Sequence, residues 1–187
     1  MKTGIFCVEG EWAANIRHRN SVQLLVGFLS AANNMREPVY RRTATVEEFR
    51  RQIGKWVKAK THNVGYFAFH GLKAKLCLDD EIHLTLEDLR GLLDGKCEGR
   101  HIVLGSCQTL AIEAEALVDF RKATKARSVS GYRKSPDWIE GSAFDIMLIT
   151  NLLHFSQPSA AKSWLEKNCG GLVEKYGLVM SYRTKAQ

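Results

Sequence analysis

Two short segments of the sequence pair residue types that carry out nucleophilic chemistry. His70 and Gly71 end the apolar run YFAFHG, and Cys107 ends the apolar run VLGSC. A cysteine thiolate attacks carbonyl carbon atoms, and a nearby imidazole lowers the pKa of the thiol or removes its proton. The backbone amides of Gly71 and Cys107 are the simplest candidates for an oxyanion hole, because a glycine lets backbone and substrate approach closely. We therefore predict His70 and Cys107 as a catalytic pair, provided that the fold brings them together.

Both segments have the pattern of buried strands in a parallel sheet. Short apolar runs alternate with amphipathic stretches along the chain, which is typical of an α/β fold with helices on both faces of a mainly parallel sheet. About six strands are predicted, at residues 4–10, 38–44, 64–70, 100–107, 126–132 and 177–183. Helices are predicted at about residues 21–34, 46–57, 86–93, 112–125, 140–155 and 159–167.

The residues that could take part in chemistry lie at the carboxyl ends of these strands. Reactive groups of parallel α/β sheets gather in the crevice beyond those ends. The third and fourth strands end in His70 and Cys107, so the two side chains meet if these strands are neighbours. Glu9 and Glu11, at the end of the first strand, face the same crevice in this scheme. The turn into the following helix also puts Cys107 at a helix N-terminus, whose partial positive charge favours a thiolate.

Four local features complete the predicted fold. Thr45 and Glu48 form a capping box for the second helix. A proline and several arginines place residues 38–44 near an edge of the sheet. Residues 72–85 alternate around three acidic residues like a small hairpin, and the two glycines at 170–171 belong to a late turn.

The two chemical segments resemble the motifs of a known group of enzymes. YFAFHG at residues 66–71 and VLGSC at residues 103–107 look like the His-Gly and Ser/Ala-Cys motifs of caspase-like (clan CD) cysteine peptidases, a group that includes caspases, gingipains, separases and bacterial CHAT peptidases. In that group His-Gly ends one central strand and the cysteine ends the next, with a gap similar to the one in this chain. The resemblance spans roughly residues 4–155. It implies a caspase-like three-layer sandwich and cysteine endopeptidase activity.

The sequence departs from true caspases. GSCQTL differs from the Gln-Ala-Cys-Arg-Gly pattern of caspases, and no long loop with processing sites follows Cys107. The small prokaryotic members are the closer comparison, and a caspase-type preference for Asp is not implied. In the CHAT and separase branches an acidic residue after the fifth strand helps to recognise a basic side chain, and Asp137 has a comparable position. Together with Glu9 and Glu11 as substrate-binding candidates, it implies cleavage after a basic residue.

Each of these residues also has a simpler interpretation. Free cysteines are among the most buried residue types, so Cys107 alone would be assigned to the core. His70 alone would be a strand-end histidine that donates to a backbone carbonyl. Asp137 can simply cap the helix that follows it. A metal site made of His70, Cys107 and a carboxylate is a minor alternative, and the peptidase scheme requires no metal and no organic cofactor.

The composition limits the class of protein. With 45% hydrophobic residues among 187, the chain can bury a substantial core, and one domain over residues 1–187 is expected. No apolar run approaches the roughly 20 residues that span a bilayer, and the start has no signal-peptide pattern. We therefore expect no membrane partner and predict the cytoplasm as the location. The five cysteines are scattered without a C-x-x-C pair, which argues against a disulfide framework and a zinc ribbon.

Three functions from different classes are compatible with these observations. The favoured one is an active cysteine endopeptidase that acts on a protein or peptide substrate. The second is a catalytically silent caspase-like binding or adaptor module. The third is a basic nucleotide- or nucleic-acid-binding domain, which the net charge of +7 suggests, but the basic residues are interleaved with acids and nucleic acid is not the expected partner. The resemblance to small bacterial members implies an effector of immune (antiviral) defence or cell death, controlled by an activating partner or a small-molecule signal.

Overall fold

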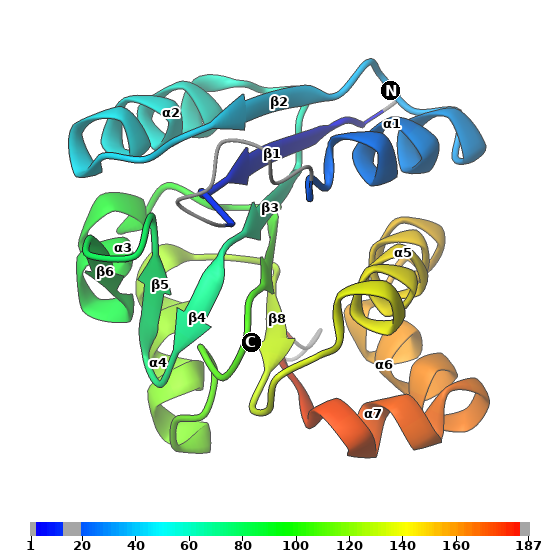
Figure 1. The fold of residues 1–187 in the computed structure, drawn as a ribbon. Coiled ribbons are helices and arrows are strands. Elements are labelled where there is room, and N and C mark those ends of the chain that lie inside the picture. Colours follow the sequence, from blue (N-terminus) through cyan, green and yellow to red (C-terminus); the bar gives the residue numbers. More distant parts are fainter. Residues whose placement is uncertain (1–2, 13–19, 184–187) are drawn as a thin grey trace.

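The core of the protein is a six-stranded sheet with the strand order β2-β1-β3-β7-β8-β9 (Figure 1). The computed structural model describes residues 3–12 and 20–183. Neighbouring strands run parallel except at one edge, where β9 runs antiparallel to β8. The predicted sheet of about six mainly parallel strands is therefore confirmed. The strands are β1 (Ile5–Glu9), β2 (Val39–Arg42), β3 (Val64–Ala68), β7 (His101–Gly105), β8 (Ser128–Tyr132) and β9 (Leu178–Tyr182).

Helices cover both faces of this sheet, as Figure 1 shows. In the described residues they are α1 (Gln23–Ala32), α2 (Val46–Lys58), α3 (Leu86–Leu93), α4 (Ala114–Thr124), α5 (Trp138–His154), α6 (Pro158–Asn168) and α7 (Gly170–Tyr176). One apolar core lies between the sheet and α2, α3 and α4. A second apolar core lies between the opposite face and α1, α5, α6 and α7. Because both faces are covered, the central strands are buried along their whole length, which explains their nearly continuous apolar sequences.

The register of β3 and β7 determines where the two predicted catalytic residues lie. The strands pair in parallel, and their last paired residues are Ala68 and Gly105. His70 and Cys107 each follow two residues later, so they leave neighbouring strands at the same edge and at the same level. Neighbouring strands lie about 4.8 Å apart. The expectation that two adjacent strand ends carry these residues is therefore confirmed at the level of the backbone.

A separate three-stranded antiparallel sheet follows β3 directly. It consists of β4 (His70–Leu72), β5 (Lys75–Cys77) and β6 (His83–Thr85), in the order β4-β5-β6. The hairpin predicted for residues 72–85 is thus part of this sheet, and His70 belongs to its first strand instead of ending β3. Since β4 continues from β3 after a single residue, the small sheet is anchored beside the carboxyl edge of the large one.

Three sequence predictions need correction. Cys107 does not lie at a helix N-terminus: α4 begins at Ala114, after a turn that contains Cys107. The glycines at 170–171 do not form a turn but open α7. The predicted capping box at Thr45 is only half formed, because the Thr45 side chain accepts from the Glu48 amide without a reciprocal bond from Glu48.

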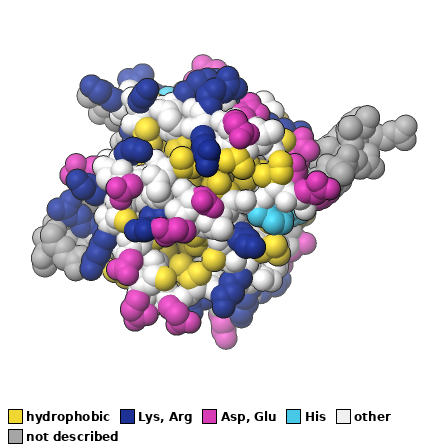
Figure 2. Space-filling view, turned by 90° about the vertical axis from the view of Figure 1, so that its left-hand side faces the viewer, with side chains coloured by type: hydrophobic (Ala, Val, Ile, Leu, Met, Phe, Trp, Pro, Cys, Tyr) yellow, Lys and Arg dark blue, Asp and Glu magenta, His cyan; other side chains and the backbone are white. Residues whose placement is uncertain are grey.

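The surface mixes charges of both signs. Figure 2 shows the side of the molecule that carries α2, α3 and the small sheet, where acidic and basic side chains are interspersed around hydrophobic patches in the middle of the face. Two pairs on these helices, Arg51 with Glu48 and Arg90 with Glu87, are close enough for ion pairing. In the described part of the chain, no helix is both long and apolar enough to cross a membrane.

Candidate active site

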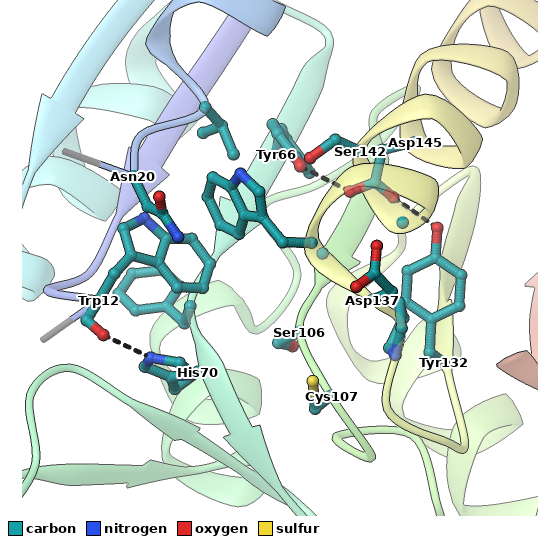
Figure 3. Close-up of a pocket in the computed structure, with 16 residues that line it drawn as sticks. Trp12, Asn20, Tyr66, His70, Ser106, Cys107, Tyr132, Asp137, Ser142 and Asp145 are labelled. Carbon is teal, nitrogen blue, oxygen red and sulfur yellow. Dashed lines mark hydrogen bonds between the residues drawn. The ribbon is translucent and has the colours of Figure 1, made fainter. Parts of the chain in front are cut away.

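A cavity of about 250 Å³ opens at the carboxyl edge of the large sheet (Figure 3). His70 and Cys107 both line it, together with aromatic side chains from several elements. Figure 3 shows His70, the first residue of β4, and Cys107, in the turn after β7, on two sides of this space. The strand order and the cavity therefore both place the His70 imidazole and the Cys107 thiol at one accessible space.

The His70 ring is oriented by a backbone carbonyl. Its Nε2 lies 2.8 Å from the carbonyl oxygen of Trp12, and the two rings meet edge to face with centroids 5.0 Å apart. A carbonyl only accepts hydrogen bonds, so Nε2 carries a hydrogen and donates it to the Trp12 oxygen. Within the described residues, no hydrogen bond joins His70 to Cys107. The imidazole is thus oriented at the cavity wall through its Nε2.

Cys107 lies half-buried at the start of a tight turn. Gln108, directly after it, has a left-handed backbone conformation with a φ of 54°, which is uncommon for a residue other than glycine. The amides of Gln108 and Leu110 donate to the carbonyls of Lys134 and Tyr132, at 3.0 and 3.1 Å. These bonds to the end of β8 and the loop after it replace helical ones, which is why no helix starts at the cysteine.

The thiol of Cys107 is not activated by its resting surroundings. Burial raises the pKa of the Cys107 thiol above its ordinary value, although hydrogen bonds with Ser135 and with its own backbone act in the opposite direction. A group with this environment rests as a neutral thiol, so attack on a carbonyl requires a base at the moment of reaction.

Gly71 packs directly against the backbone of the Cys107 turn. A Cβ atom at Gly71 would lie 2.2 Å from the carbonyl oxygen of Cys107 and 2.5 Å from Oγ1 of Thr109. The buried Thr109 hydroxyl also bonds to Ser106 Oγ at 2.7 Å and to the carbonyl of Lys75 at 3.1 Å, which ties the turn to the small sheet. Among the described residues, the Cys107 amide donates no hydrogen bond to a backbone carbonyl. The pairing of Gly71 and Cys107 in an oxyanion hole remains a prediction.

The structure gives Glu9 a different position from the one predicted. Its side chain is fully buried and accepts hydrogen bonds from Trp12 Nε1, Ser21 Oγ, the Val22 amide and the Tyr40 hydroxyl. It is not part of the cavity wall in the described residues. With its oxygens occupied, Glu9 has no geometry for direct contact with a substrate. Instead it joins β1, β2 and the start of α1, and it holds the Trp12 residue whose carbonyl orients His70.

We expect Glu9→Gln to lower the free energy of unfolding by about 1–3 kcal/mol, because an amide cannot satisfy all four donors around it. Glu11→Gln is the matched control. The Glu11 side chain is exposed and also lies outside the cavity wall, so its replacement should change stability by less than about 0.5 kcal/mol. Urea unfolding of the two variants measures both values. Equal stability of both variants would contradict the structural role of Glu9.

Asp137 caps α5 at the mouth of the cavity. Its Oδ1 accepts from the amides of Ile139 and Glu140, at 2.9 and 3.1 Å, and these bonds lower the pKa of the Asp137 carboxyl. The side chain is exposed and contributes to the cavity wall. Capping therefore occurs, while the second carboxylate oxygen has no partner among the hydrogen bonds of the described residues.

Sequence reasoning missed the buried carboxylate in the cavity. Asp145 of α5 is 5% exposed and accepts hydrogen bonds from the hydroxyls of Tyr132 at 2.5 Å and Tyr66 at 2.6 Å. All three residues line the cavity. The available signal was an acidic residue in a largely apolar helix, because a buried polar residue is more informative than an exposed apolar one.

Burial raises the pKa of Asp145 to about 6, although the bonds from Tyr132 and Tyr66 act in the opposite direction. A carboxyl whose pKa is higher in the folded state stabilises the fold most when it is protonated. Stability should therefore fall as pH rises from about 4 to above 6, by about 2–3 kcal/mol from this group alone. Urea unfolding of the wild type and Asp145→Asn between pH 4 and 8 measures the difference. A constant difference across this range would contradict the assignment.

Within the described residues, the remaining cysteines and the possible metal ligands form no second candidate site. Cys7, Cys77 and Cys97 are free and buried, as expected for small apolar core residues, and Cys169 is free and half-buried. No group of three or more His, Cys, Asp or Glu side chains in the described ranges is arranged to hold a metal ion.

Comparison with solved structures identifies the class of fold. Caspase-1 from Spodoptera frugiperda superposes with a TM-score of 0.50 over 82% of this chain and 69% of its own, at 13% sequence identity. A secreted C11 cysteine protease from Bacteroides thetaiotaomicron, solved with an irreversible peptide inhibitor, gives a TM-score of 0.49 at 13% identity. The match covers 70% of this chain but only 38% of that protease. With its mainly parallel six-stranded sheet between two helical layers, the protein has the caspase-like fold.

The family is shown by the sequence itself. Residues 2–158 match the model described as "Family of unknown function (DUF6642)", and the chain belongs to this family. No curated protein is similar enough in sequence to match the chain.

Proposed function

We propose that this protein is a cysteine endopeptidase with Cys107 as the nucleophile and His70 as the proton-transfer group. The observation that carries the proposal is the equal register of the two residues beyond the neighbouring strands β3 and β7, at one cavity. The caspase-like fold supports the proposal. His70 and Cys107 follow two neighbouring central strands of this fold, as the resemblance of the two motifs predicted. We further propose that residues 1–187 form one peptidase domain.

The geometry supports a simple proton path. A peptide carbonyl enters the cavity between the two groups, and Nδ1 of His70 takes the thiol proton as the sulfur bonds to the carbonyl carbon. Collapse of the tetrahedral species breaks the C–N bond, and the amine leaves with the proton from His70. Water then attacks the thioester with His70 again as the base, which releases the carboxylic acid and restores the thiol. The Trp12 carbonyl stabilises the imidazolium that forms in both steps.

The amides of Gly71 and Cys107 are our candidates for oxyanion stabilisation. Close packing of Gly71 on the Cys107 turn fixes the two backbones relative to each other. Donors held in place before reaction cost no reorganisation when charge develops on the carbonyl oxygen, and this is the source of their catalytic effect.

The finer parts of the proposal rest on the resemblance. They are cleavage after a basic residue, a protein or peptide substrate, a cytoplasmic location, and a CHAT-like role in bacterial antiviral defence or cell death under the control of an activating partner or signal. The cavity wall supports a basic residue, since Asp137 and Asp145 both contribute to it. Glu9 and Glu11 are not among the proposed substrate-binding residues, because neither contributes to that wall in the described residues.

A catalytically silent binding module is the alternative with an observation in its favour. The raised pKa of Cys107 and the lack, within the described part of the chain, of a hydrogen bond to His70 leave the resting thiol without activation. On the face that Figure 2 shows, acidic side chains lie among the basic ones, which disfavours nucleic-acid binding at that face.

A peptide electrophile that alkylates an active-site thiol separates these functions. We expect peptide chloromethyl ketones to modify Cys107 in preference to Cys169, which is also half-buried and free but lies outside the cavity. Peptide mapping by mass spectrometry locates the adduct. The same treatment should block cleavage of an unfolded protein substrate. Failure to modify Cys107, or equal modification of both cysteines, would favour the silent binding module.

A further inference from the structure

The cavity beside Cys107 has a carboxylate at its inner end. Figure 3 shows Asp145 between Tyr66 and Tyr132, and its side chain is 5% exposed whereas Cys107 is half-buried. Each oxygen of Asp145 accepts one tyrosine hydroxyl and keeps capacity for a second donor. The two tyrosines fix the direction of the carboxylate without neutralising it.

The depth of this carboxylate matches a long side chain. A Cβ atom at Gly105 would lie 3.0 Å from Oδ2 of Asp145, so the carboxylate is beside Gly105 on β7. Gly105 ends β7 and precedes Cys107 by two residues, which span at most about 7 Å of chain. A substrate residue whose carbonyl meets the Cys107 sulfur would need a side chain of that length, and the Lys and Arg side chains provide it.

The electrostatics of the cavity favour a cation. In the described residues Asp145 forms no ion pair, and none of the described residues of the cavity wall is Lys or Arg. A buried carboxylate without a cationic partner costs free energy that a bound cation recovers.

The walls of the cavity suit the methylene groups of a Lys or Arg side chain. Trp12 and Trp138 meet edge to face with centroids 4.8 Å apart, and both line the cavity with Phe69. Aromatic faces attract cations and pack against methylene groups.

We propose that Asp145 binds the ammonium or guanidinium group of the substrate residue immediately before the scissile bond, and that this residue is Lys or Arg. The inference rests on the proposed peptidase function and assigns its specificity to the inner end of the cavity. Asp137 is not the specificity residue, because it is exposed at the mouth and its Oδ1 is occupied by two amides of α5.

Four peptide chloromethyl ketones that differ only in the residue before the reactive group test the proposal. Lys, Arg, norleucine and Glu are compared, because norleucine resembles Lys in shape but lacks the charge. The rate of Cys107 modification is followed by mass spectrometry in the full-length protein. We expect the Lys and Arg probes to react roughly tenfold or more faster than the norleucine probe. Equal rates for Lys and norleucine would overturn the inference while leaving the peptidase proposal intact. Reaction with none of the four would overturn the peptidase proposal itself.

Two variants assign the preference to one carboxylate. Asp145→Asn should remove the advantage of the Lys probe, so that the ratio of the Lys rate to the norleucine rate falls to about 1. Asp137→Asn should keep the advantage. Loss of the preference in Asp137→Asn, or its survival in Asp145→Asn, would overturn the assignment. The wild-type comparison of Lys with norleucine needs no variant, so the proposal remains falsifiable if Asp145→Asn does not fold.

Discussion

Cys107→Ala is expected to lower kcat/KM for any peptide that the wild type cleaves by about 10⁴-fold or more, because the covalent route is lost with the sulfur. The substitution removes one half-buried atom without changing the backbone, so the free energy of unfolding should change by less than about 1 kcal/mol. A fluorogenic peptide assay and urea unfolding of the same preparation give both values.

The matched control for this prediction is Cys169→Ala. Cys169 is the other half-buried free cysteine of the described residues, and its sulfur contacts Met147 Sδ at 3.5 Å, away from the cavity. The Cys169→Ala variant should keep full activity. His70→Ala should resemble Cys107→Ala, because the neutral thiol then has no base. Cleavage that survives in Cys107→Ala would show that the observed activity has another source.

Gly71→Ala is expected to have the second-largest effect, about a 10²-fold loss of kcat/KM. The added Cβ would lie 2.2 Å from the carbonyl oxygen of Cys107 and 3.0 Å from its amide nitrogen, and neither backbone atom can rotate away. The strand β4 and the Cys107 turn must therefore separate, which displaces His70 and Cys107 relative to each other. Overpacking of this kind should also cost about 1–3 kcal/mol of stability.

Gly91→Ala is the control for a change from glycine to alanine. Gly91 lies in α3, and a Cβ atom there meets nothing within 4 Å. An exposed helical glycine replaced by alanine should stabilise the protein by about 0.5–1 kcal/mol and leave activity unchanged. If Gly71→Ala matched Gly91→Ala in activity and stability, the close contact between β4 and the Cys107 turn would be disproved.

The large sheet and the placement of two site residues could be predicted from the sequence. Continuous apolar runs before His70 and Cys107 identified β3 and β7, because strands covered on both faces have few polar residues. Both residues reach the same cavity because the two strands are neighbours in parallel register. Each of these strands is buried along its own length, so the local sequence pattern is enough to predict the strand.

The remaining features depend on contacts that no local pattern contains. The partners of Glu9 include Ser21 and Tyr40, which reach it only when β2 and the start of α1 pack beside β1. Asp145 is bound by Tyr66, which is 79 positions away in the chain. The start of α4 was misplaced because the bonds from the Cys107 turn to the end of β8 compete with helix formation. Tertiary contacts decided all three cases.

The group that orients the His70 ring is a main-chain oxygen, and this affects how its part in the proposed mechanism can be tested. The carbonyl of Trp12 is present whatever side chain occupies that position. Replacement of the Trp12 side chain would act on this oxygen only indirectly, through the contacts of the ring with Glu9 and His70. Only a backbone change, such as an ester in place of an amide or a proline that redirects the chain near Trp12, would test its contribution directly.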